Sequence, residues 1–261
     1  MGDTHTGSKT GLTASPKRDL QKRLLDRYSD ALLWYGERPS TLVHNGDGWD
    51  GKDEKGRDID TDCMLDQAED CAELIMMADP KDEVILVTGT RYHDSHKGQE
   101  FTKHCAAHIK LLSLRCHGKE IKVSIRRKLK TTINGWFILE TRHFIGGSSI
   151  PHGRATAALK EQLWNVMNAA LDARYRDEKV QWPQLLVFSH RHYYVAAETA
   201  WGDAIVLPGW QALGGVFGDE ICTGHIDLGL VRLEVGEKEV DGWGRDKKLF
   251  PAGVVRRTEH R

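Results

Sequence analysis

The chain of 261 residues lacks paired cysteine motifs and long apolar runs. Its five cysteines are odd in number and contain no Cys-x-x-Cys pair, which argues against a disulfide scaffold. No apolar run approaches the roughly 20 residues that span a bilayer. The first residues, Met-Gly-Asp-Thr-His, lack the apolar stretch of a signal peptide. These absences predict a cytoplasmic protein that does not cross a membrane.

An excess of charge of either sign is also missing. The 37 Lys and Arg residues balance 38 Asp and Glu residues, so no global field attracts nucleic acid or an anionic membrane. Hydrophobic residues make up 39% and charged residues 29%, which is typical of a folded protein. Without an internal repeat or a low-complexity linker, the sequence predicts one domain over residues 1–240 and a polar tail over 241–261.

Strands alternate with helices along the chain, according to the spacing of apolar residues. The spacing predicts helices over 16–35, 62–77, 101–112 and 155–174, and strands over 41–44, 83–88, 120–126, 136–141, 185–188, 204–207 and 228–235. The helix over 155–174 carries Leu159, Leu163, Met167 and Leu171. Alternating strands and helices followed by a strand-rich final third predict an α/β sandwich with mixed sheets.

Residues that carry chemistry form four short clusters. They are Asp3-Thr4-His5, Gly46-Asp47-Gly48-Trp49-Asp50, Gly89-Thr90-Arg91-Tyr92-His93-Asp94 and His190-Arg191-His192. The last three clusters follow predicted apolar strands, where α/β sheets build their sites. Their shared position predicts that they meet at one edge of the sandwich.

The chemistry of these clusters points to metal binding. Side chains two residues apart in a strand-like stretch point the same way, so Asp-x-His and His-x-His can each present two ligands to one spot. Carboxylate and imidazole together suit Mn²⁺, Fe, Zn²⁺ or Ni²⁺ better than Mg²⁺ or Ca²⁺. A carboxylate flanked by imidazoles can bridge two ions, as in two-metal hydrolytic centres.

The ordered set resembles the calcineurin-like metallophosphoesterases. That family shows Asp-x-His, Gly-Asp-x-x-Asp, Gly-Asn-His-Asp/Glu, a lone His after a strand, and Gly-His-x-His. Further stretches are similar to its phage and prokaryotic branch: Gly7-Ser8, Gly11-Leu12, Tyr92-His93 and Pro208-Gly209-Trp210-Gln211. The resemblance implies an α-β-β-α sandwich with two mixed sheets.

The resemblance also implies which residues bind the two ions. Asp3, His5 and His192 would bind one metal, and Asp47 would bridge both. His190 and a lone histidine would bind the other metal, together with Thr90 at the position where the family has Asn. Asp50 would orient a ligand histidine or the Gly46-Asp47 turn.

Three histidines compete for the role of the lone ligand. His143 ends a predicted strand, as the family's ligand does, and is therefore the expected residue. His152 lies in a loop rich in Gly, Ser and Pro, where it could contact substrate instead. His117 follows a segment that is less typical of a strand.

The sequence departs from the family pattern at several positions. Thr90 offers a neutral hydroxyl in place of an amide oxygen, so the second metal is expected to bind more weakly or to take an extra water. The catalytic histidine would be His93, two residues later than in the family. Ser189 replaces the Gly before His-x-His, and only two residues precede Asp3.

The activity implied is that of a phosphodiesterase with two divalent ions, Mn²⁺ first among them. A hydroxide held between the ions would attack phosphorus, and His93 would protonate the leaving oxygen. The substrate would be a phosphate diester, whether a small molecule, a nucleotide or a nucleic acid. Two alternatives remain: a DNA or RNA nuclease of the same superfamily, and a non-catalytic binding module with a degenerate second metal site.

Other clusters give weaker signals. A zinc site is conceivable from His104, Cys105, His108, Cys116 and His117, but their spacing matches no standard zinc pattern. A basic stretch over 122–130 is typical of a solvated face and only secondarily of phosphate guidance. Trp49, Trp210 and Tyr92 either line a cleft or pack in the core.

Overall fold

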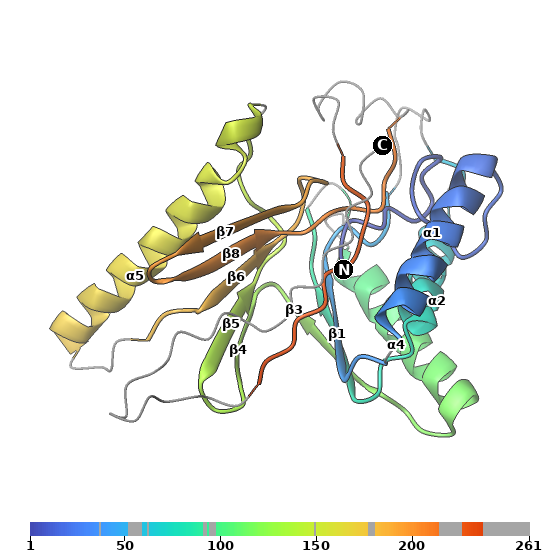
Figure 1. The fold of residues 1–261 in the computed structure, drawn as a ribbon. Helices are drawn as coiled ribbons and strands as arrows, with labels where there is room; N and C mark the ends of the chain where they lie inside the picture. The colour runs from blue at the N-terminus through green and yellow to red at the C-terminus, as the bar shows by residue number, and fades with distance from the viewer. Residues whose placement is uncertain are drawn as a thin grey trace.

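The computed structural model describes residues 1–36, 38–51, 59–61, 63–90, 93, 98–148, 150–176, 181–213 and 226–236. Two β-sheets face each other in the middle of the molecule, and helices cover their outer sides (Figure 1). Helix α5 lies outside one sheet, while α1, α2 and α4 lie on the side of the other (Figure 1). This arrangement confirms the predicted α/β sandwich of two sheets.

The first sheet is wholly parallel. It has the order β1-β2-β3, formed by Thr41–Asn45, Glu83–Val87 and Lys122–Arg126. The helices connecting these strands are α2 (Met64–Met77) and α4 (Gly98–His117), and α1 (Asp19–Tyr35) precedes β1. Because the strands are parallel, their carboxyl ends lie at one edge.

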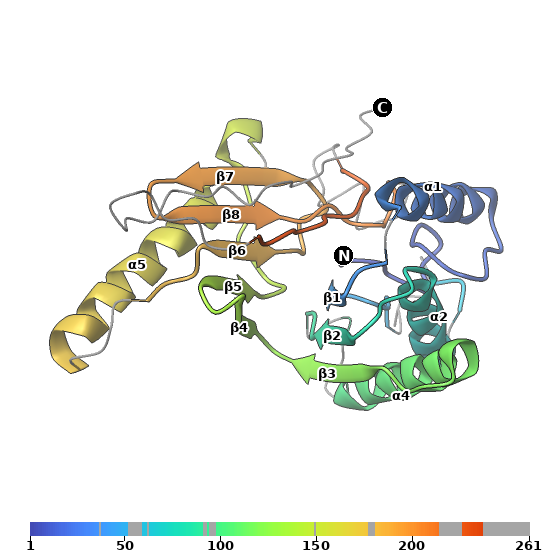
Figure 2. The ribbon, with the colours of Figure 1, turned by 60° about the horizontal axis from the view of Figure 1, so that its bottom comes forward.

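The second sheet is mixed. It has the order β4-β5-β6-β8-β7, formed by Leu129–Ile133, Phe137–Thr141, Leu185–Phe188, Gly202–Val206 and Val195–Thr199. Strands β5, β6 and β8 are parallel, and β4 and β7 are antiparallel edge strands. The short helix η1 (Pro151–Gly153) and α5 (Thr156–Arg176) connect β5 to β6. The two sheets form separate rows in Figure 2.

Each face of the first sheet buries its own set of side chains. Val84 and Leu86 of β2 pack with Ile75 on the helical side. Ile85, between them in sequence, packs with Leu129 on the side of the second sheet. This alternation is that of a strand buried on both faces, and it explains why the strand reads as a continuous apolar run.

The N-terminus pairs with the end of β1. The Met1 amine donates to the Val43 carbonyl at 2.9 Å, and the Asn45 amide donates to the Met1 carbonyl at 2.7 Å. The Asp3 amide then donates to the Gly46 carbonyl at 2.9 Å. These bonds hold Asp3 beside the Asp47 turn even though Asp3 lies in no regular strand.

Most predicted elements are confirmed, with shifted ends, but one is wrong. The stretch 228–235 forms no regular strand, and Leu228 makes only an isolated bridge to Gly209. Its alternating Val231 and Leu233 pack against the second sheet, so the pattern reports one buried face and not backbone pairing. Strands β4 and β7 were not predicted.

The predicted tail lies outside the described residues, and none of the described helices has the length and apolar character to cross a membrane.

Candidate metal centre

The site lies where four parallel strands end. Asp47 and Thr90 follow β1 and β2 of the first sheet, and His143 and His190 follow β5 and β6 of the second. Because these ends meet between the sheets, residues far apart in sequence come together. The predicted position of the clusters is confirmed at this level.

Two groups of side chains could each hold a metal ion. One group is Asp3, His5 and His192, and the other is Asp47, His143 and His190. Within each group the ligand atoms lie within 4.8 Å of one another. A third combination of His5, Asp47 and His93 connects the two groups.

Five of the candidate ligands adopt left-handed backbone conformations. Their φ angles are 53° for Asp3, 49° for His5, 47° for Asp47, 76° for His190 and 52° for His192. Positive φ in non-glycine residues costs about 1–3 kcal/mol each and is concentrated at functional sites. The backbone of both motifs is therefore not strand-like as expected. Asp3 and His5 nevertheless reach one group, as the Asp-x-His spacing predicts. His190 and His192 join different groups, so the expectation that His-x-His presents both imidazoles to one spot is wrong.

Asp47 occupies the middle of the site. Its Oδ1 accepts hydrogen bonds from the Thr90 amide at 2.7 Å and the Thr90 hydroxyl at 3.1 Å. Its Oδ2 lies 2.9 Å from His143 Nε2, 3.8 Å from His190 Nδ1 and 4.0 Å from His93 Nε2. Thr90 therefore contacts Asp47 directly and holds its carboxylate with one oxygen toward the imidazoles.

Two glycines allow this close approach. A Cβ on Gly89 would lie 2.1 Å from Asp47 Oδ1. Gly46 has a φ of +85°, and a Cβ there would lie 2.4 Å from His143 Nδ1. Neither position can accept a side chain without displacing a candidate ligand.

His143 is oriented by Asn45. The Nδ1 of His143 lies 2.7 Å from the Asn45 carbonyl, which can only accept, so Nδ1 carries a proton. The buried Nε2 faces Asp47 but lacks a hydrogen bond of proper geometry in the described structure. A buried nitrogen held in this way toward carboxylates is suited to a metal ion.

The other group is held by comparable contacts. The Asp3 carboxylate accepts the His190 amide at 3.0 and 3.2 Å. His5 Nδ1 lies 2.9 Å from Asp50 Oδ1, and His5 Nε2 lies 3.2 Å from His192 Nε2. The Asp50 contact places the proton on Nδ1 and leaves the His5 Nε2 lone pair facing His192, which suits a shared ion.

His93 lies next to both groups. Its Nδ1 is 3.0 Å from the Asp50 carbonyl, and its ring centroid is 4.6 Å from that of His5. The residue is 8% exposed. Its Nε2 is thus directed into the site, although His93 stands two residues later than the family pattern implies.

Electrostatics in the site are dominated by pairing between carboxylates and imidazoles. Burial opposes ionisation of Asp3 and Asp47, but the neighbouring imidazoles, His143 first, hold the pKa of both carboxyls below the ordinary value. Burial opposes protonation of His143, but Asp47 and Asp3 raise its pKa to about 9. Burial lowers the pKa of His5. The proton on His143 thus compensates the negative charge of Asp3 and Asp47, as a bound cation would do.

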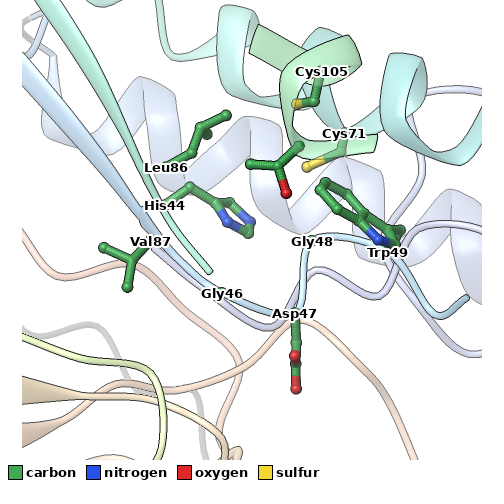
Figure 3. Close-up of a pocket in the computed structure, with 10 residues that line it drawn as sticks. His44, Gly46, Asp47, Gly48, Trp49, Cys71, Leu86, Val87 and Cys105 are labelled. Atoms are coloured by element: carbon green, nitrogen blue, oxygen red, sulfur yellow. The ribbon is translucent and has the colours of Figure 1, made fainter. Parts of the chain in front are cut away.

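A small cavity lies behind the Asp47 turn (Figure 3). It has a volume of about 10 Å³, and His44, Trp49 and Cys71 are among its lining residues. Burial lowers the pKa of His44 to about 3, so its ring is neutral. The cavity holds one water at most, whereas the Asp47 side chain points away from it (Figure 3). This side of the turn is therefore packing, and the chemistry faces the other way.

The other candidate histidines lie elsewhere. His152 is exposed in η1, and His117 at the end of α4 pairs with Asp79 at 2.8 Å. Of the three candidates for the lone ligand, His143 alone belongs to one of the two groups. His104 pairs with Glu69 at 2.9 Å, and none of the metal-binding groups found among the described residues includes it.

Sequence reasoning missed Asn45. Its amide donates to Ser189 Oγ at 2.9 Å, its side-chain oxygen accepts from Thr141 at 2.9 Å, and its carbonyl orients His143. It therefore ties together the ends of both sheets. Its only sequence signal is its place directly before Gly46-Asp47.

Comparison with known proteins leaves the family open. No protein-family model matches the chain, and no curated protein matches it. Similar solved structures include Vps29 from Chaetomium thermophilum, at 10% identity over 98% of this chain and 97% of that one, with a TM-score of 0.43. A Vps29 double mutant from Entamoeba histolytica gives 14% identity, 91% and 84% coverage and a TM-score of 0.42. Wild-type Vps29 of that organism, complexed with Zn²⁺, gives 13% identity over 76% of this chain and 86% of that one, with a TM-score of 0.33. Because these identities and TM-scores are low, the function of this chain has to be argued from the geometry of the site.

Proposed function

We propose that this chain is a binuclear metal-dependent phosphodiesterase. The observation that carries the proposal is the position of Asp47, which belongs to one group with His143 and His190 and also lies close to His5 of the other group. One carboxylate shared by two imidazole-rich groups is the composition of a two-metal hydrolytic centre. The left-handed backbone of five of these residues supports a functional origin of the arrangement.

The donor atoms suit two transition-metal ions. Asp3, His5 and His192 would hold one ion, His143 and His190 the other, and Asp47 would contact both. Mixed nitrogen and oxygen donors suit Mn²⁺, Fe, Zn²⁺ or Ni²⁺. We propose Mn²⁺ first among these because the resemblance to the metallophosphoesterases implies it. When bound, such ions neutralise charge on phosphate oxygens and bring the pKa of water near neutrality.

The surrounding residues fix the ligands in place. Asp50 orients His5, Asn45 orients His143, and Thr90 orients Asp47, each through a hydrogen bond described above. His93, with Nδ1 bonded to the Asp50 carbonyl, would protonate the leaving oxygen through Nε2. These contacts make the site rigid, so little reorganisation is needed when substrate binds.

A diester is favoured over a monoester because an exposed aromatic ring lies beside the site. Phe144, next to His143 in sequence, is 62% exposed, and its ring centroid lies 4.9 Å from that of His190. A monoester presents one organic group, whereas a diester presents two. The exposed ring offers a surface on which the second group can pack.

One observation favours a non-catalytic binding module as the second candidate. The Thr90 hydroxyl lies 3.1 and 3.4 Å from the two Asp47 carboxylate oxygens, so it is already engaged where the family has a metal-binding Asn. The second ion would then have one ligand fewer from the protein. A chain that binds only one ion would fit this alternative.

Elemental analysis together with a substrate screen tests the proposal. We expect two ions per chain and hydrolysis of simple diesters in excess of monoesters. Cyclic nucleotides and single-stranded DNA in the same screen would reveal a nucleotide-specific enzyme or a nuclease. One ion or none, with no hydrolysis of any ester, would favour the binding module.

A further inference from the structure

The outward face of α5 carries a row of large apolar side chains. They are Leu163, Trp164, Met167, Leu171 and Tyr175, with exposed fractions of 44%, 49%, 44%, 48% and 75%. We call these five residues the α5 stripe. Apolar residues scattered singly over a surface are normal, but a contiguous row on one helix marks an interaction site.

The inner face of the same helix accounts for its packing in the monomer. Ala158 and Gln162 are fully buried, and the Gln162 amide donates to the Pro183 carbonyl at 2.9 Å. The helix lies on the outside of the second sheet (Figure 1). The five stripe residues are exposed, so the stripe is on the side of the helix away from the sheet. The apolar residues that predict this helix in the sequence therefore include several that stay exposed in the monomer.

Part of the stripe has the spacing of a helix pair. Trp164, Met167 and Leu171 follow one another at intervals of three and four residues, the a/d spacing of a coiled-coil seam, and Arg174 continues that spacing three residues later. All four are exposed. A seam of this kind packs against a second helix with the same repeat.

The stripe is also nearly symmetric about Ala169. An antiparallel copy centred there brings Met167 against Leu171 of the other chain and Trp164 against Arg174, and each contact occurs twice. A two-fold interface requires this self-complementarity. Ala169 marks only the register of the two-fold axis, since its own side chain lies on the opposite side of the helix from the stripe.

Charge complementarity favours the same pairing. In the monomer the Arg174 guanidinium lies 5.7 Å from the Tyr175 ring centroid, so it already takes up a position over an aromatic face. In the antiparallel pair it would face Trp164, the best aromatic partner for a cation. The flanks alternate in sign, with Lys160 and Asp172, and so lack the basic excess that a membrane surface would attract.

The area agrees with a modest dimer. An aromatic side chain buries about 150–250 Å² when fully covered, so Trp164 and Tyr175, at 49% and 75% exposure, offer roughly 250 Å². The two Leu and the Met of the stripe bring the total to roughly 500 Å² per chain when all five are covered. Two chains together reach about 1,000 Å², which is the lower limit for a specific interface. We propose that α5 pairs with α5 of a second copy of this chain, antiparallel about Ala169, to form a weak homodimer.

Sedimentation velocity over a range of protein concentrations tests this proposal. We expect the full-length chain to shift from monomer to dimer as concentration rises. Trp164→Glu should weaken dimerisation at least about tenfold, because it replaces an aromatic anchor that contacts Arg174 with a carboxylate. Leu114→Glu, on the exposed side of α4 at 46% exposure, is the matched control and should leave dimerisation unchanged. Circular dichroism verifies that both variants fold.

A charge swap tests the contact between Trp164 and Arg174. Trp164→Arg alone would place Arg against Arg and should abolish the dimer, and Trp164→Arg combined with Arg174→Trp would restore both contacts. The direction of the helices is tested by oxidative cross-linking, in which a mixture of the Trp164→Cys and Arg174→Cys variants should join through the two substituted positions. Cross-linking of Arg174→Cys to itself through position 174 would show a parallel pair and overturn the proposed arrangement. A wild-type chain that stays monomeric at every concentration overturns the proposal altogether, as does a monomer that instead binds anionic vesicles.

Discussion

Asp47 Oδ2 and His143 Nε2 lie 2.9 Å apart although the two residues follow strands of different sheets. The contact joins the two halves of the sandwich at the site itself. Any ion bound there would be held by both sheets. Site geometry and sheet packing therefore depend on each other.

Substitution of the shared carboxylate should affect both ions. Asp47→Asn keeps the shape but removes the charge, so metal content and diester hydrolysis should fall together. The loss of affinity should exceed the 10–100-fold typical of residues that only support a ligand. Elemental analysis and a diester assay measure the two effects.

The control for this substitution is Asp19→Asn, a carboxamide exchange on the exposed start of α1. It should change neither metal content nor activity. An Asp47→Asn enzyme that retains two ions and full turnover would refute the bridging assignment.

The choice among histidines gives a second prediction. His143→Ala should empty one of two metal sites, because it removes a buried nitrogen aimed at Asp47. His152→Ala should leave metal content unchanged and mainly raise KM, since His152 is exposed and outside both groups. Elemental analysis of the two variants decides, and the reverse pattern would transfer the ligand role to His152.

Metal binding should release a proton from His143. Its pKa of about 9 in the metal-free site exceeds the ordinary value of 6.5, so the ring is protonated at neutral pH. Coordination needs a neutral Nε2, and apparent affinity should therefore rise about tenfold per pH unit up to pH 9 and then level off. His5, whose pKa burial lowers, adds no proton near neutrality.

Calorimetry in buffers of different ionisation enthalpy measures this proton directly. About one proton should be released per ion bound at the His143 site near pH 7.5. The variant His143→Ala lacks this imidazole, so metal binding to it should release about one proton fewer per chain. Affinity independent of pH between 6.5 and 9 would show that His143 does not exchange its proton for metal.

Local patterns in the sequence predict which residues form the site better than they predict how those residues are arranged. The four motifs each need only a few neighbouring residues, so they could be recognised, and three of them could be placed at strand ends. The left-handed backbone at Asp3 and His190 could not, because it is imposed by hydrogen bonds between distant segments, such as the His190 amide to Asp3. The same holds for Thr90, whose hydroxyl turns toward Asp47 only in the folded chain.

Apolar spacing likewise predicts where a helix or a buried face occurs, but it does not predict what packs against the apolar residues. The period in residues 155–174 identifies α5 but not that Met167 and Leu171 face solvent. The alternation in 228–235 reports a buried face, yet its backbone joins no sheet. Which surface covers a residue depends on tertiary contacts that no single segment encodes.

The role of His93 depends on the leaving group. Its Nε2 lies 4.0 Å from Asp47 Oδ2 and can reach a substrate atom in the same space. A general acid matters most when an alkoxide departs, because that oxygen must be protonated as the bond breaks. A nitrophenolate departs unaided. His93→Ala should therefore lower the rate on an alkyl or nucleoside diester by about 10²–10⁴-fold and the rate on a nitrophenyl diester much less.

Metal content separates this role from the alternatives. His93 lies near His5 and Asp47, so it could also act as a ligand, and the variant must retain both ions for the kinetic comparison to report on acid catalysis. Loss of an ion in His93→Ala would make it a ligand that compensates for Thr90. Equal slowing of both diesters with both ions bound would assign His93 to phosphate contact or loop support. A selective loss on the alkyl diester, with metal retained, is the result that the position of Nε2 leads us to expect.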